Sequence, residues 1–121
     1  MQADLATSID RHDKGGLSTS KSVLMYSHDS YCLGHLRRNT NIASRLTREM
    51  PDFTALLLAD CASSGVFDMP KGVDLIKLPS VDKTGADAWA PKGLRVSQQM
   101  TKDLRAQLIK SAARAFKPDC F

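Results

Sequence analysis

The chain of 121 residues lacks the features that mark several large classes of protein. No apolar run approaches the roughly 20 residues that span a bilayer, and the first residues lack the apolar core of a secretory signal. The absence of a signal predicts a cytoplasmic protein. Residues 1–20 are polar and contain two adjacent glycines, which predicts a poorly ordered leader before a domain at residues 21–121.

Cysteine is scarce and widely spaced. Cys32, Cys61 and Cys120 form no CxxC pair, which argues against a zinc site built from cysteines and fits reduced thiols. Cys61 and Cys120 stand beside apolar runs, so we expect small core residues there. Since the histidines and carboxylates form no convincing cluster either, we expect no metal and no other cofactor.

Excess charge is small, and aromatic residues are few. The net charge of +4 favours anionic ligands and leaves peripheral contact with an anionic membrane open. Aromatic residues make up 6% of the chain and are not interleaved with the basic ones, and no nucleic-acid reader motif is present. We therefore expect no nucleic-acid partner.

Short apolar runs and helical periodicities do occur, and they alternate along the chain. Strands are predicted at residues 21–27, 52–61 and 73–79, and helices at residues 34–50 and 94–116. The second helix carries an apolar stripe of Met100, Leu104, Leu108, Ala112 and Ala115. Residues 79–93 read as one long loop, and residues 119–121 as the start of a fourth strand.

This alternation predicts an α/β fold with a parallel sheet between helices, the partial form of a Rossmann-like doubly wound domain. Such sheets usually carry five or more strands, so we expect a fragment whose sheet has an exposed apolar edge. Ligands of doubly wound folds bind beyond the carboxyl ends of the strands. The loop after the first predicted strand, "SHDSYCLGHLRR", is therefore the first place to look for a site.

The side chains of this loop suit an anionic ligand and proton transfer. His28 and His35 can exchange protons near neutral pH, and Asp29 can orient a histidine or accept a hydroxyl proton. A ligand can approach the backbone closely at Gly34, and the start of the helix favours an anion. The candidate ligand-binding residues of the loop are Ser27, Gly34, Arg37 and Arg38. Each also has a structural reading: a turn, a helix cap, or a solvated helix face.

Known phosphate-binding signatures are missing. "LGH" has one glycine where the dinucleotide fingerprint GxGxxG has three, and no GK[ST] follows to make a Walker loop. Spacing alone therefore predicts an anion-binding loop of low specificity.

The segment "MYSHDSYCLGHLRRNTNIASRL" resembles the opening of a family of predicted bacterial glycosyltransferases of the GT-B type, which begins with a strand, "SHDxxGLGHLRR" and a helix. "GVFDMPKGVDLIKLPSVDK" and the pieces around Leu104 and Asp119 also look similar, in the same order. The resemblance runs from about Ser22 to the end of the chain. It extends distantly to the lipid-linked N-acetylglucosaminyltransferase of peptidoglycan synthesis and to the plant galactolipid synthases.

The resemblance implies an acceptor-binding domain that works with a second, donor-binding domain or partner chain, and transfers sugar from a nucleotide-sugar to an acceptor hydroxyl. It places His35 as the candidate base and His28 and Asp29 at the cleft. Ser64 and Gly65 follow the second predicted strand and form a candidate acceptor rim, and Trp89 is another candidate there. Cys32 stands where the family usually has glycine, which puts close backbone approach at that position in doubt.

Two other functions remain open at this point. One is a non-catalytic module that binds phosphate or a nucleotide, and the other is a nucleotide-sugar epimerase or hydrolase of GT-B architecture. The loop would look similar in all three.

Overall fold

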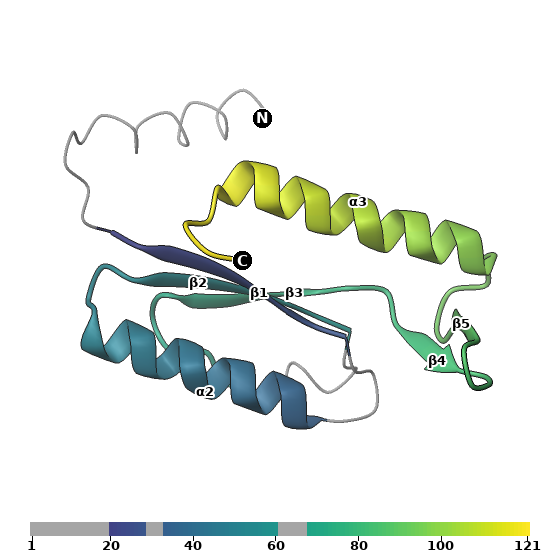
Figure 1. Ribbon diagram of the computed structural model, residues 1–121, viewed down its shortest axis with the longest axis horizontal. Helices are drawn as coiled ribbons and strands as arrows, with labels where there is room; N and C mark the ends of the chain where they lie inside the picture. Colours follow the sequence, from purple (N-terminus) through teal and green to yellow (C-terminus); the bar gives the residue numbers. More distant parts are fainter. Residues whose placement is uncertain (1–19, 29–32, 61–67) are drawn as a thin grey trace.

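The computed structural model describes residues 20–28, 33–60 and 68–121, and the predicted polar leader therefore lies almost wholly outside the described residues. Figure 1 shows a sheet layer with one helix packed on each side of it. The sheet holds β1 (Ser22–Ser27), β2 (Thr54–Ala59) and β3 (Val73–Lys77), and the helices are α2 (Leu33–Glu49) and α3 (Gln98–Phe116). The predicted α/β class is confirmed.

The three strands form a parallel sheet in the order β1-β2-β3. Ser27 pairs with Ala59, and Ala59 pairs with Lys77, so the carboxyl ends of all three strands meet at one edge. A helix covers each face of the sheet, which is why β1 and β2 read as nearly continuous apolar runs, whereas β3 also carries the exposed Asp74 and Lys77.

Helix α2 covers one face of the sheet. Leu36 and Ala43 are buried against Leu57 of β2 and Val73 of β3. The predicted helix bounds agree with the observed ones to within one residue at each end. At the start of β3, Gly72 adopts a φ of +94°, a left-handed conformation that favours glycine.

Helix α3 covers the opposite face, but the predicted apolar stripe is only partly right. Leu108 and Ala112 pack on Leu24, Leu58 and Leu78 as a second core. Exposed positions of the predicted stripe are Met100, Leu104 and Ala115, whereas buried positions in the first half of the helix are Thr101 and Arg105. The two stripes differ there because hydrogen bonds to Asp60 and to the carbonyl of Pro79 allow the guanidinium of Arg105 to be buried.

The first residue of α3 also differs from the prediction. The helix begins at Gln98 instead of residue 94, because the side chain of Ser97 accepts a hydrogen bond from the backbone N–H of Met100 and caps the helix.

The predicted long loop at residues 79–93 is wrong. This segment contains an antiparallel hairpin of β4 (Val81–Lys83) and β5 (Trp89–Pro91). The strands have three residues each, too few for an alternating pattern to stand out. Pro91 can end a strand at the edge of a two-stranded sheet, where its missing N–H costs no ladder hydrogen bond.

The last residues lie beside β1, at the edge of the sheet away from β2. Cys120 forms a parallel bridge to Val23, and its carbonyl accepts a hydrogen bond of 3.0 Å from the N–H of Leu24. The predicted start of a fourth strand is thus present as one bridge. Cys120 is exposed, so the prediction of a core cysteine was wrong there. Cys61 lies outside the described residues.

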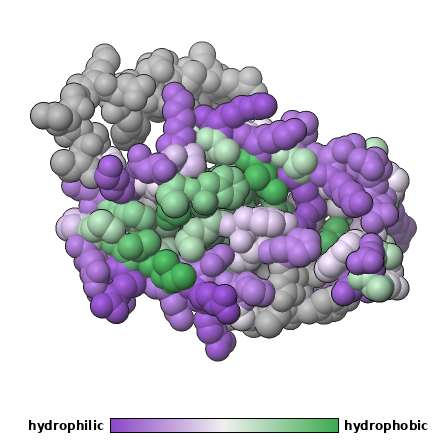
Figure 2. Space-filling model, viewed as in Figure 1, coloured by the Kyte–Doolittle hydropathy of each residue, from purple (hydrophilic) through white to green (hydrophobic). Residues whose placement is uncertain are grey.

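Hydrophobic side chains gather along the sheet layer between the two helices in Figure 2, on the side that faces the viewer. Phe121, next to the single bridge, is 66% exposed. This apolar surface agrees with the exposed sheet edge expected from the sequence, and the arrangement is compatible with a partial Rossmann-like fold.

Candidate functional site

Polar residues collect where the three parallel strands end. His28 follows β1, Asp60 follows β2, and Leu78 follows β3 in the same row of the sheet. The β4–β5 hairpin comes directly after β3 at this edge, and the first half of α3 lies above it (Figure 1). The parallel topology therefore brings side chains from distant parts of the sequence together.

A cavity of about 450 Å³ opens at this edge beside the end of β1. Its lining consists of Tyr26, Ser27, His28, His35, Asn39 and Trp89. Ser27 is 4% exposed, and its hydroxyl accepts a 3.0 Å hydrogen bond from the side-chain amide of Asn39. This bond joins the end of β1 to the second turn of α2 and fixes one wall of the cavity.

His28 and Trp89 form another wall of the cavity. The two rings meet in an edge-on arrangement, with their centroids 5.0 Å apart and their planes at 68°. The ammonium of Lys83 lies 6.0 Å from the centroid of the Trp89 ring, within cation–π range. The hairpin thus adds the indole of Trp89 to a cavity that is otherwise lined by Tyr26, two imidazoles and the small polar groups of Ser27 and Asn39.

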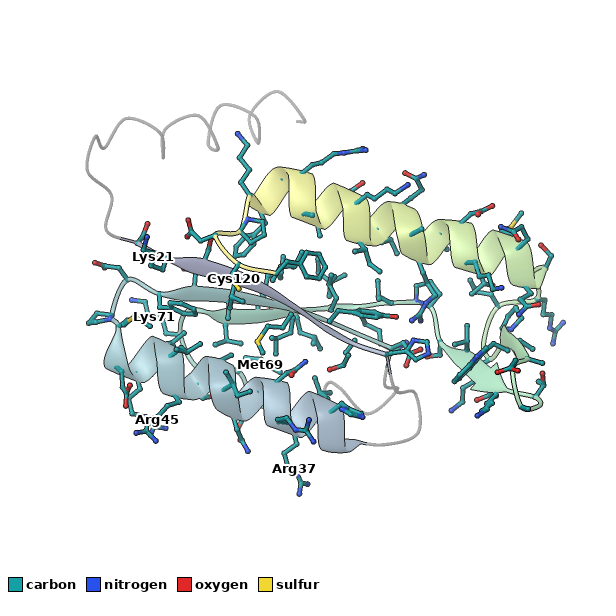
Figure 3. The ribbon with its side chains drawn as sticks, viewed as in Figure 1. Lys21, Arg37, Arg45, Met69, Lys71 and Cys120 are labelled. Atoms are coloured by element: carbon teal, nitrogen blue, oxygen red, sulfur yellow. The ribbon has the colours of Figure 1, made fainter. Side chains whose placement is uncertain are left out.

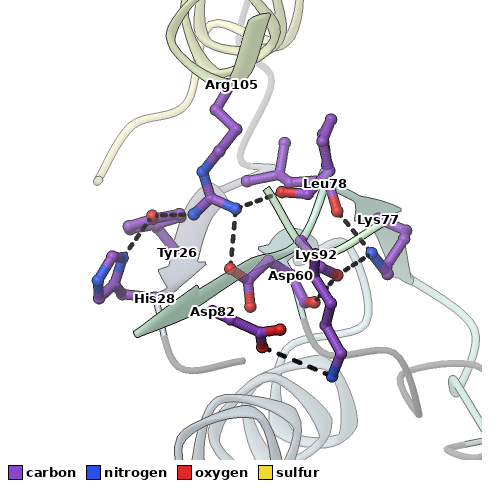
Figure 4. Close-up of polar contacts among 10 residues, drawn as sticks. Tyr26, His28, Asp60, Lys77, Leu78, Asp82, Lys92 and Arg105 are labelled. Atoms are coloured by element: carbon purple, nitrogen blue, oxygen red, sulfur yellow. Dashed lines mark hydrogen bonds and ion pairs between the residues drawn. The ribbon is translucent and has the colours of Figure 1, made fainter. Parts of the chain in front are cut away.

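Behind this wall lies a buried ion pair. Nη1 of Arg105 donates a 2.8 Å hydrogen bond to Oδ2 of Asp60 and a 2.6 Å hydrogen bond to the carbonyl of Pro79. Nη2 of the same guanidinium donates to the hydroxyl of Tyr26 at 2.7 Å. Figure 4 shows Arg105 reaching from α3 to Asp60 and Tyr26, with the ring of His28 next to the hydroxyl of Tyr26.

Asp60 is fully buried, and burial raises the pKa of its carboxyl despite the opposing attraction of Arg105. Its second oxygen, Oδ1, has no hydrogen-bond partner among the described residues. Desolvation therefore outweighs the ion pair at this position, the balance expected when few hydrogen bonds compensate a buried charge.

The backbone around Asp60 is held by a second set of contacts. The hydroxyl of Ser80 donates to the carbonyl of Asp60 at 2.7 Å, and the ammonium of Lys77 donates to Ser80 at 2.8 Å and to the carbonyl of Leu78 at 2.6 Å. These bonds tie the end of β2 to the segment after β3. Hydrogen bonds from α3 and from the segment after β3 thus hold Asp60 in place next to the cavity.

A larger hollow of about 570 Å³ lies between the end of β3, the residues after β5 and α3. Its lining is mainly aliphatic, with Leu78, Pro79, Leu94 and Leu108, and includes no histidine, carboxylate or aromatic residue. We place the candidate site in the smaller cavity, because proton-transferring and hydrogen-bonding side chains converge there.

The predicted site residues fall into three groups. Ser27, His28 and His35 line the cavity together. Gly34, Arg37 and Arg38 are exposed on α2 and do not line it, and Figure 3 shows Arg37 pointing away from the sheet. Positions outside the described residues are Asp29, Ser64 and Gly65.

Sequence reasoning missed several residues at this edge: Tyr26, Asn39, Asp60 and Arg105. Asp60 had a usable signal, since a carboxylate directly after the apolar run "TALLLA" lies at the carboxyl end of a buried strand. Tyr26 lay hidden inside an apolar run, and Asn39 looked like an ordinary residue of a polar helix face.

Among residues 20–28, 33–60 and 68–121, no three side chains of the metal-binding types come together as a metal site would need. Within the same ranges, none of the helices has both the length and the apolar character required to cross a membrane.

No family model, no curated protein and no solved structure matches the chain, so the resemblance to GT-B glycosyltransferases remains a prediction.

Proposed function

We propose that this chain forms the acceptor-binding part of a glycosyltransferase, which transfers a sugar from a nucleotide-sugar to an acceptor hydroxyl. The observation that carries the proposal is the cavity at the carboxyl edge, where Ser27, His28, His35 and Trp89 converge. An aromatic side chain offers a face to the apolar side of a sugar ring. The surrounding hydroxyl, amide and imidazole groups offer hydrogen bonds to sugar hydroxyls.

The topology supports the same proposal. With Cys120 beside β1, the strand order reads β3-β2-β1 followed by the terminal segment, and α2 and α3 lie on opposite faces. We infer that the sheet is the first part of a doubly wound, Rossmann-like domain, in which chain order reverses beside β1. The cavity lies at the carboxyl end of that strand, where such folds bind ligands.

In this scheme His35 is the base that takes the proton from the acceptor hydroxyl, and the oxygen attacks the anomeric carbon as nucleoside diphosphate leaves. A positioned base contributes about 10²–10⁴-fold. The donor is held mainly by a second domain or a partner chain. Arg37 and Arg38 are exposed on α2. With a membrane-bound acceptor, these arginines would provide peripheral contact with an anionic membrane surface.

The test is a ¹H–¹⁵N NMR titration of the chain with UDP-glucose, methyl β-D-glucoside and pyrophosphate in turn. We expect the amides of Ser27, His28, His35 and Asn39 and the indole N–H of Trp89 to shift with either sugar compound. Trp89→Leu should weaken these shifts, whereas Arg37→Gln, outside the cavity, should leave them unchanged.

Other outcomes favour different functions. Shifts with pyrophosphate alone, confined to Gly34, Arg37 and Arg38, would favour a phosphate-binding module without catalysis. A dispersed spectrum that no sugar compound perturbs at millimolar concentration would overturn the proposed function. An epimerase or hydrolase would bind UDP-glucose but not methyl β-D-glucoside, because it needs no acceptor sugar.

A further inference from the structure

A continuous chain of hydrogen bonds joins the buried ion pair to the cavity. Nη2 of Arg105 donates to the hydroxyl oxygen of Tyr26 at 2.7 Å, and that oxygen lies 3.1 Å from Nδ1 of His28 (Figure 4). Arg105 is 7% exposed and is itself fixed by Asp60 and by the carbonyl of Pro79. The donor at the start of this chain therefore has little freedom to turn away.

The direction of each hydrogen bond follows from counting protons. A guanidinium can only donate, so the oxygen of Tyr26 accepts from Arg105. The single proton of the phenol then points to Nδ1 of His28, which must accept it. Because a neutral imidazole carries one N–H, that proton resides on Nε2.

The opposite assignment leaves a proton without a partner. If Nδ1 of His28 carried the proton, the oxygen of Tyr26 would face two N–H donors. Its own O–H would then have no acceptor among the described residues. Leaving a part-buried donor unsatisfied is costly, so the arrangement favours one tautomer.

We propose that Arg105 and Tyr26 are positioning residues that hold neutral His28 with its proton on Nε2, as a hydrogen-bond donor to a ligand oxygen in the cavity. Among the described residues, Nε2 has no hydrogen-bond partner, and the exposed ring of His28 lines the cavity. The edge-on contact with Trp89, at 5.0 Å between centroids, restricts rotation of the ring.

This inference rests on the proposed function only for the identity of the ligand. It divides the work between the two histidines of the cavity: His28 donates to an oxygen of the bound sugar or phosphate and orients it, while His35 remains the candidate base. A histidine whose accessible nitrogen already carries a proton cannot take one there from the acceptor.

The tautomer is tested without any ligand, by long-range ¹H–¹⁵N NMR of the chain at about pH 8.5, where an ordinary imidazole is neutral. We expect His28 to show protonated Nε2 and an unprotonated, hydrogen-bonded Nδ1. Tyr26→Phe should move the Nδ1 resonance toward that of a ring nitrogen in water and introduce the second tautomer. The ring of His35 is the internal control and should not change.

Protonated Nδ1 in the wild-type chain would overturn the inference, as would a His28 spectrum that Tyr26→Phe leaves unchanged. If Tyr26→Phe does not fold, the wild-type spectrum alone decides. Arg105→Lys keeps the positive charge but not the planar fork, so we expect a partial loss of the single tautomer.

The donor role is tested by titrating two variants with UDP-glucose and methyl β-D-glucoside. His28→Gln places an amide N–H near the position of Nε2 but cannot act as a base, whereas His28→Ala removes the donor. We expect His28→Gln to bind within about threefold of wild type and His28→Ala about five- to tenfold more weakly. If His28→Ala binds methyl β-D-glucoside more weakly, the hydrogen-bond acceptor is a sugar oxygen. If it binds only UDP-glucose more weakly, the acceptor is a phosphate or nucleotide oxygen.

Equal weakening in His28→Gln and His28→Ala would contradict the donor role. Failure of the wild-type chain to bind either compound would count against the proposed function, while the ligand-free spectrum would still decide the tautomer.

Discussion

Arg105 of α3 and Asp60 at the end of β2 form an ion pair of 2.8 Å whose side chains are 8% and 0% exposed. The pair links the helix on one face of the sheet to the row of residues that ends the strands. It also supplies the fixed end of the hydrogen-bond chain that reaches His28 through Tyr26. The two partners differ in their contacts: Arg105 also donates to Tyr26 and to the carbonyl of Pro79, whereas Oδ1 of Asp60 has no hydrogen-bond partner among the described residues.

This asymmetry predicts different costs for removing each partner. Asp60→Asn should cost about 2 kcal/mol at pH 7, because the guanidinium of Arg105 loses its counter-charge while the amide oxygen can still accept its hydrogen bond. Arg105→Met should cost about 3 kcal/mol, because it leaves the buried carboxylate of Asp60 without a counter-charge. It also removes the hydrogen-bond donors to Tyr26 and to the carbonyl of Pro79. Urea unfolding followed by circular dichroism measures both.

The control for Arg105→Met is Arg114→Met, an exposed position of the same helix, which should stay within about 0.5 kcal/mol of wild type. Arg105→Met should also cost less in an Asp60→Asn background, where no buried charge is left behind. A larger loss from Asp60→Asn than from Arg105→Met would contradict the assigned balance.

The pH dependence of stability follows from the same carboxyl. The folded-state pKa of Asp60 lies above the model value of 3.8, so the folded chain holds this proton more tightly than the unfolded chain does. The contribution of Asp60 to stability is therefore complete below pH 3.8 and is lost as pH rises through the folded-state pKa. Other carboxyls titrate in the same range, so the comparison must be with Asp60→Asn.

We expect the stability of wild type relative to Asp60→Asn to fall as pH rises from about 3.5 and then to level off. In Arg105→Met the decline should extend to higher pH, because the attraction that opposes desolvation is gone. Urea midpoints across this range, with a ¹³C titration of the Asp60 carboxyl, provide the measurement. A relative stability that rises with pH would show that the ion pair, not desolvation, dominates.

The sequence was enough to predict the parts of the fold that repeat a simple pattern. The apolar runs of β1 and β2 can be recognised without knowing which strands they pair with, because strands covered on both faces are largely apolar. The α2 face with Leu36 and Ala43 follows from helical periodicity. Ser27, His28 and His35 could be placed together because ligands bind beyond strand ends, a rule of topology.

What failed depended on contacts between distant residues. Arg105 is buried only because Asp60, 45 positions earlier, and the carbonyl of Pro79 receive its N–H groups. A search for apolar residues at helical spacing passes over an arginine. The predicted apolar stripe therefore runs through Met100 and Leu104, which are exposed. The β4–β5 hairpin was missed because its three-residue strands gain their definition from pairing, which local sequence does not encode.

Gly72 is predicted to be a sensitive position of the backbone. Its φ is +94°, and a Cβ there would lie 2.9 Å from the carbonyl oxygen of Phe53 and 3.1 Å from Cγ2 of Thr47. Gly72→Ala should therefore lower the free energy of unfolding by about 1–3 kcal/mol. Gly93→Ala is the matched control, since nothing lies within 4 Å of its added methyl and it should be neutral or slightly stabilising. Similar costs for both variants would contradict the strain assigned to Gly72.

The start of α3 gives a prediction about the frame that carries Arg105. Ser97→Ala removes the acceptor that the N–H of Met100 uses at 3.1 Å, and it should cost about 1 kcal/mol. Ser111→Ala, an exposed position inside the same helix, should be neutral or stabilising because alanine favours the helix. Thermal unfolding of the two variants makes the comparison, and an unchanged midpoint for Ser97→Ala would show that the cap is not needed.

The proposed division between acceptor and donor parts predicts that this chain alone does not transfer sugar at a useful rate. Charge develops on the departing nucleoside diphosphate, and preorganised donors aimed at such charge are worth about 10²–10³-fold each. Among the described residues, the lining of the cavity includes no lysine or arginine to take that role. We expect no release of UDP above background when the chain is incubated with UDP-glucose and methyl β-D-glucoside. Release that His35→Ala abolishes would mean that this chain holds the donor without help, and would sink the requirement for a second domain while strengthening the role of His35.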